Sequence, residues 1–118
     1  MASEISRALD RVGPDASGLD VVAVSVDPKG DTPVAVRAFL RRHRLAGRMS
    51  YLVGSERELR PIWRAWYASA QVAGAPASVH TARIVLVDRE GRQVGAYSAG
   101  TPIPVEDLAA DMRALLGS

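Results

Sequence analysis

Four segments of the chain have the apolar spacing or the end signals of amphipathic helices. Residues 3–12 and 105–116 both place apolar side chains on one face at helical spacing. Thr32 followed by Pro33 is typical of a helix start, with the threonine as cap and the proline in the first turn. We expect the helix that begins there to run to about His43.

A third helix is predicted after Ser55, because Ser55 and Glu58 have the spacing of a capping box. Pro61 lies inside that helix and is expected to kink it or restart it, since proline lacks the backbone N–H that the helix needs. Trp63 and Trp66 share one face of the same helix. Core packing is the first interpretation of this face, and an exposed apolar surface is the second.

Apolar runs predict four strands. Residues 19–26 are almost continuously apolar, as expected of a strand covered on both faces, and residues 49–53 form a shorter run. Residues 82–88 and 93–98 flank the turn Arg89-Glu90-Gly91 and predict a β-hairpin. The resulting order, α-β-α-β-α-β-β-α, predicts a single α/β domain.

Composition fits a small globular domain and restricts its chemistry. The chain has 118 residues, 47% of them hydrophobic and 24% charged, with a net charge of +2. It contains no cysteine, which excludes disulfides, thiolate–metal sites and cysteine nucleophiles within this sequence. No apolar run is long enough to span a bilayer, and the first residues do not resemble a signal peptide.

Few residues are candidates for metal binding or catalysis. His80 follows a segment rich in small residues, and one histidine alone does not make a metal site. His43 stands among arginines at the predicted end of a helix, where a solvated position is expected. Asp27 and Asp31 flank a Pro- and Gly-containing turn, which favours a turn-forming and capping role over metal binding.

The arginines around His43 suggest an anion-binding patch, but no aromatic residues are interleaved with them. We therefore expect no nucleic-acid partner. Paired carboxylates, a serine with a neighbouring base and a glycine-rich phosphate loop are also missing from the sequence, so no catalytic residue is assigned.

Three segments resemble the SCO/SenC family in sequence and in order. Val24–Pro33 reads V-S-V-D-P-K-G-D-T-P and is similar to the family's S-V-D-P-x-x-D-T-P segment. Leu52–Ser55 reads L-V-G-S and resembles its L-T-G-S. Val79–Thr81, followed by the strand Arg83–Val87 and by Asp88–Gly91, resembles its D-H-S/T and L-V-D-x-x-G elements. Val79 replaces the acidic residue that commonly precedes the family's histidine.

The resemblance implies a thioredoxin-like domain over residues 1–118, with a mixed sheet and helices on both faces. Members of this family are exported or membrane-anchored towards the periplasm, and they bind copper while assisting cytochrome c oxidase assembly. By position, His80 matches their histidine ligand of copper, and the Asp27–Asp31 loop lies at the copper-site end of the sheet. Their C-x-x-x-C pair belongs to a segment that would precede residues 3–12, so we expect a domain incomplete at its N-terminus.

A cysteine-free domain of this kind is expected to bind no copper by itself and to be no enzyme. The resemblance implies a protein partner, either an oxidase subunit or a redox protein. Loss of a central strand would expose strand edges, which predicts a possible homodimer. Two alternatives stay open: a cysteine-less fragment of a thiol peroxidase or reductase of the thioredoxin superfamily, and a non-catalytic interaction module.

Overall fold

Along the chain the elements follow the predicted order of helix, strand, helix, strand, helix, two strands and helix, with a short 3-10 helix after the first helix. The computed structural model describes residues 1–67, 83–98 and 101–117. The chain divides into a terminal unit, Met1–Asp20 with Thr81–Ser118, and a central unit, Val21–His80. Each unit has its own small sheet and its own buried side chains.

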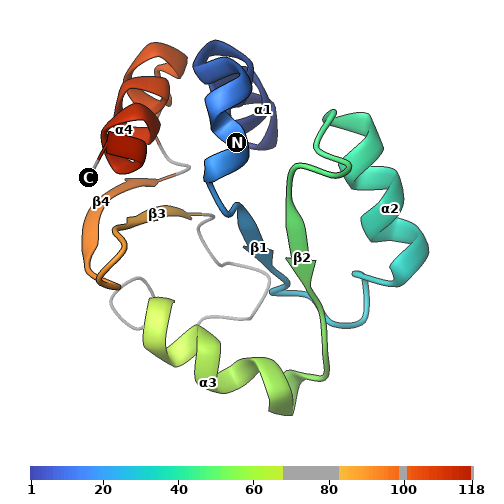
Figure 1. Cartoon of the computed structure of the whole chain (residues 1–118). Coiled ribbons are helices and arrows are strands. Elements are labelled where there is room, and N and C mark those ends of the chain that lie inside the picture. The colour runs from blue at the N-terminus through green and yellow to red at the C-terminus, as the bar shows by residue number, and fades with distance from the viewer. Residues whose placement is uncertain (68–82, 99–100, 118) are drawn as a thin grey trace. The chain divides into compact units, whose positions relative to one another are not determined.

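The terminal unit packs a helix pair beside a hairpin. Helices α1 and α4 lie side by side, as Figure 1 shows. Their contact buries apolar side chains that recur at helical spacing, as the sequence pattern predicted. These side chains are Ala8, Leu9, Leu108, Ala109 and Met112. The elements are α1 (Ala2–Val12), the 3-10 helix η1 (Gly13–Gly18), β3 (Arg83–Val87), β4 (Gln93–Ser98) and α4 (Val105–Gly117).

The hairpin of β3 and β4 is antiparallel, with Arg83 opposite Ser98 and an irregularity between Leu86 and Val87. Leu86 is the buried residue of this hairpin. Gly95 lies opposite it, and a Cβ at Gly95 would come within 3.2 Å of the Leu86 side chain. The close approach of the leucine explains a residue without a side chain at this point of the strand.

The central unit is a parallel strand pair joined through a helix. Val22 pairs with Ser50 and Val24 with Leu52, and α2 connects the two strands, as a parallel pair requires. Figure 1 shows α2 alongside β2, where the Phe39 ring meets the Tyr51 ring edge-on at 5.9 Å. The elements are β1 (Val22–Val24), α2 (Pro33–Arg42), β2 (Ser50–Leu52) and α3 (Glu56–Tyr67).

Strand β1 is shorter than predicted and is not buried on both faces, because the side chain of Val22 is 53% exposed. The described residues form two two-stranded sheets, with β1 next to β2 and β3 next to β4. The apolar run alone therefore overstated the burial of this strand.

Both helices of the central unit begin with the capping residues that the sequence predicted. The Thr32 side chain accepts a hydrogen bond from the backbone N–H of Ala35 at 3.2 Å, which caps α2. Ser55 and Glu58 form the reciprocal capping box of α3, with bonds of 2.9 and 3.1 Å. The predicted restart at Pro61 is wrong, because α3 continues through that residue as one helix.

Candidate functional site

The loop that follows β1 is organised by one carboxylate. The Ser25 hydroxyl donates to Asp31 Oδ2 at 2.6 Å, and the Tyr51 hydroxyl reaches the same oxygen at 3.3 Å. Ser25 is completely buried, whereas Asp31 is half-buried. A buried hydroxyl is costly unless it is hydrogen-bonded, so Asp31 both satisfies Ser25 and holds the end of the loop against β2.

Asp27 shapes the turn inside this loop. Its Oδ1 accepts from the backbone N–H of Gly30 at 3.2 Å, and its own N–H donates to the Ser25 hydroxyl oxygen at 3.3 Å. A Cβ at Gly30 would lie 2.2 Å from Asp27 Oδ2, so the turn needs glycine at this place for steric reasons. These bonds give Asp27 the turn-forming role that the sequence indicated.

Helix α3 is tied to the same loop by a tryptophan. The Trp63 indole N–H donates to the backbone carbonyl of Ser25 at 2.8 Å, and the Trp63 side chain is only 6% exposed. Trp66, on the same helix, is 41% exposed. Core packing, the first interpretation of this face, therefore holds for Trp63. Exposure at the surface, the second interpretation, holds for Trp66.

The predicted copper ligand, His80, lies outside the described residues, so its role stays a prediction. Within residues 1–67, 83–98 and 101–117, no group of three or more His, Cys, Asp or Glu side chains is arranged to hold a metal ion. The structure brings Asp27 and Asp31 together through Ser25, and their link to a copper site is likewise still a prediction.

His43 forms the C-terminal cap position of α2, as expected for a helix end. Its ring lies 4.7 Å from the ring of Phe39 at an angle of 57°. Arg41 and Arg42, which immediately precede His43, lie in the last turn of the helix. Neighbouring guanidinium groups oppose the approach of a metal cation.

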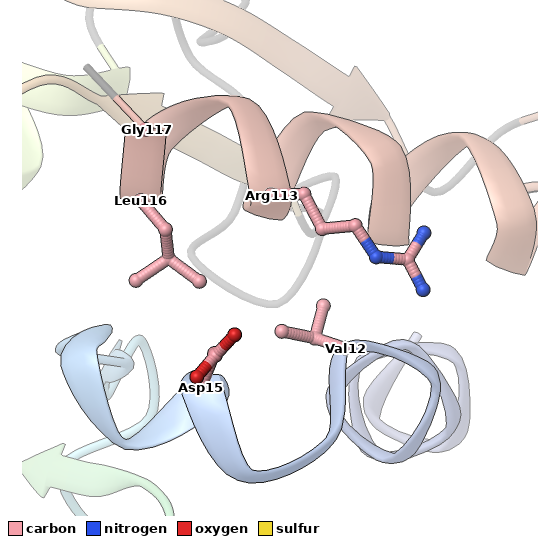
Figure 2. A pocket seen from close by; sticks show the side chains of 5 residues that line it. All are labelled: Val12, Asp15, Arg113, Leu116 and Gly117. Atoms are coloured by element: carbon pink, nitrogen blue, oxygen red, sulfur yellow. The ribbon is translucent and has the colours of Figure 1, made fainter.

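The terminal unit contains an open groove. It encloses about 540 Å³ between the end of α1, η1 and the last turns of α4, and Figure 2 shows its lining. The guanidinium of Arg113 is held by the Arg11 carbonyl at 2.7 Å, and Asp15 is exposed. The lining residues are Val12, Asp15, Arg113, Leu116 and Gly117.

Sequence reasoning missed two members of the loop network, Ser25 and Tyr51. The signal for Ser25 was present, since it is the polar residue inside the apolar run of residues 19–26. No signal marked Tyr51, because its partner Asp31 is twenty residues away in the sequence.

The elements and the loop define an α/β protein whose Ser25–Pro33 segment is a turn held by side-chain hydrogen bonds. Comparison with protein families assigns the class: the SCO1/SenC model matches residues 1–117, and the chain belongs to this family. SCO1/SenC proteins are thioredoxin-like, copper-binding chaperones that act in cytochrome c oxidase assembly through contacts with oxidase subunits, and they are not catalysts.

Neither the curated proteins nor the solved structures contain a significant match to this chain. Among the described residues, none of the helices combines the length and the apolar character that a membrane crossing demands.

Proposed function

We propose that this chain acts in cytochrome c oxidase assembly as the partner-contacting part of a SCO1/SenC-type domain, and that it does not hold copper by itself. One observation carries the proposal: the family match extends over residues 1–117, yet the sequence has no cysteine. Soft thiolates are the ligands that select Cu(I), and a histidine alone does not replace them.

His80 is the proposed contribution of this chain to a copper site that other ligands complete. The rigid Ser25–Pro33 loop supports such a site by fixing the end of β1, in which Asp27 holds the turn and Asp31 binds Ser25 and Tyr51. Copper is cargo in this scheme and not a resident cofactor. A thiol peroxidase or reductase is disfavoured by the family match.

A Cu(I) titration against a chromogenic chelator tests the proposal. The wild-type chain, His80→Ala and His43→Ala are compared, the last being a matched control because it removes the other histidine. We expect none of the three proteins to withdraw Cu(I) from the chelator. Addition of a synthetic peptide with a C-x-x-x-C sequence is expected to give a mixed complex that is weakened by His80→Ala and not by His43→Ala. Equal complexes with all three proteins would remove His80 from the proposal.

The finer architecture is also a proposal. In a thioredoxin-like domain, β1–β2 and β3–β4 would belong to one mixed sheet with helices on both faces. In the described residues β1 pairs with β2 and β3 with β4, so each pair has uncovered edges. We propose that a second copy of the chain pairs with one of these edges. Light scattering at micromolar concentration tests self-association, and a strictly monomeric mass would contradict the homodimer.

Export, with the domain facing the periplasm, completes the proposal and follows from the family alone. Fractionation of cells that express the native gene tests it, and recovery of the protein only with cytoplasmic markers would contradict it.

A further inference from the structure

The segment from the start of α2 to the cap of α3 carries positive charge without any negative charge. Between residues 32 and 55 the sequence has five arginines and no aspartate or glutamate. Four of these arginines, Arg37, Arg41, Arg42 and Arg44, are exposed. In the neighbouring helix α3 the pattern differs, because glutamates alternate with arginines and Arg60 forms an ion pair with Glu56 at 3.3 Å.

The structure directs these arginines outwards. The opposite face of α2 carries Phe39 and Leu40, and the Phe39 ring packs against Tyr51 of β2. The outward face contains Arg37, Arg41 and Arg42. Arg44 follows the helix end in a left-handed backbone conformation with φ of 57° and is also exposed. Together these four arginines are termed the α2 arginine surface.

No counter-charge within the described part of the chain neutralises this surface. Its four arginines form none of the ion pairs there, whereas Arg11, Arg60 and Arg92 each face a carboxylate. The helix dipole favours cations in the last turn and accounts for Arg41 and Arg42. It does not account for Arg37 in the middle of the helix, because the dipole effect fades within one turn.

We propose that the α2 arginine surface docks an acidic surface of a protein partner. The planar guanidinium pairs with carboxylates through two parallel hydrogen bonds, and arginine is enriched at protein interfaces. The choice of a protein as partner rests on the proposed function, since the family acts through contacts with oxidase subunits.

Two other anionic partners fit the surface less well. Single-stranded nucleic acid needs aromatic side chains between the cations, and the aromatic residue of α2, Phe39, is used inside the unit. A helix that binds a membrane surface inserts a large apolar side chain, and the Phe39 ring of α2 is held against Tyr51 of β2. Apart from Val34, which is exposed at the start of the same face, charge is all that this face offers a bilayer or a nucleic acid.

The test uses the copper-free full chain and a fluorescein-labelled peptide rich in aspartate and glutamate. Fluorescence anisotropy gives the Kd for wild type, for a triple variant with Arg37, Arg41 and Arg42 changed to Gln, and for a matched triple variant with Arg57, Arg60 and Arg64 changed to Gln. Both variants remove three positive charges from exposed positions of the central unit. We expect about tenfold weaker binding for the first and less than about twofold for the second.

Equal weakening of both variants would overturn the proposal, because net charge alone would then explain binding. Tighter binding to vesicles with anionic phospholipid or to DNA than to the acidic peptide would also overturn it. A third variant with Arg37, Arg41 and Arg42 changed to Lys keeps the charge but loses the planar guanidinium groups, so its Kd is expected to lie between those of wild type and the Gln variant. A Kd as high as that of the Gln variant, with unchanged circular dichroism, would contradict a charge-based surface. Because copper is absent from the assay, its outcome is separate from that of the copper titration.

Discussion

The indole N–H of Trp63 donates a hydrogen bond of 2.8 Å to the backbone carbonyl of Ser25, and both residues are buried. The bond joins α3 to the chain immediately after β1, across 38 residues of sequence. The Ser25 hydroxyl is bound in turn by Asp31, so the side chain and the carbonyl of one residue are both fixed. Rigidity of the Ser25–Pro33 loop therefore depends on contacts that come from β2 and from α3.

Replacement of Trp63 by Phe is expected to lower the free energy of unfolding by about 1–3 kcal/mol. The Ser25 carbonyl would lose its partner in a buried place, and an unsatisfied buried acceptor has about that cost. Urea unfolding followed by circular dichroism measures the change. Trp66→Phe is the matched control, because Trp66 is 41% exposed and a surface substitution is expected to stay within about 0.5 kcal/mol. An equal decrease in the free energy of unfolding for both variants would show that the indole hydrogen bond does not stabilise the fold.

The bond between Ser25 and Asp31 predicts energetic coupling. Ser25→Ala removes the buried donor, and Asp31→Asn removes the charged acceptor of the 2.6 Å bond. A double-mutant cycle on the free energy of unfolding is expected to give a coupling of about 1 kcal/mol, since residues in one hydrogen-bond network are not additive. Asp27→Asn paired with Asp31→Asn serves as a comparison, because no hydrogen bond links those two side chains directly. Additive losses in the Ser25 and Asp31 cycle would contradict the network.

Local signals made the helix ends of the central unit predictable. Thr32 with Pro33, and Ser55 with Glu58, act within four residues of each other, and both caps are present. Pro61 shows where a local rule is insufficient. Helix α3 continues through it while Leu59 and Trp63, on either side in sequence, are buried, so tertiary packing outweighs the missing backbone bond.

Long-range contacts were beyond the sequence pattern. The apolar run at residues 19–26 indicated a strand, but nothing in it showed that Val22 would be exposed or that Trp63 would bind Ser25. Both facts depend on which elements meet in space. His80 was predicted from a motif, and a motif gives a position without giving the ligands around it.

Tyr97 is expected to make the terminal unit sensitive to high pH. Its hydroxyl donates to the carboxylate of Asp111 on α4, and this hydrogen bond, aided by burial, raises the pKa of Tyr97 from 10.0 to about 12. The folded state therefore retains the proton more strongly than the unfolded state does. The stabilisation is complete below pH 10.0 and is lost as the pH rises through about 12.

Ultraviolet titration of tyrosinate checks this prediction. A tyrosinate step near 12 is expected for the wild-type chain, and Tyr97→Phe should remove that step. Tyr51→Phe is the control, because it removes a tyrosine that donates to a different carboxylate, that of Asp31. A step that persists in Tyr97→Phe would place the perturbed hydroxyl elsewhere.

Glu58 is expected to make the fold less stable as the pH falls into the acid range. The backbone N–H of Ser55, and secondly the Ser55 hydroxyl, hold the pKa of Glu58 below its usual value of 4.5. The unfolded state then binds the proton more readily than the folded state, so the stabilisation is present above pH 4.5 and is lost as the pH falls through the lower pKa of the folded state.

Glu58→Gln keeps an acceptor for the Ser55 N–H but has no charge to titrate. Urea unfolding at a series of pH values is expected to show a shallower acid decline for Glu58→Gln than for wild type. Ser55→Ala keeps the backbone N–H, which is the larger cause, and should retain more of the wild-type slope than Glu58→Gln does. The same slope in Glu58→Gln and wild type would show that the capping box contributes nothing to the acid sensitivity.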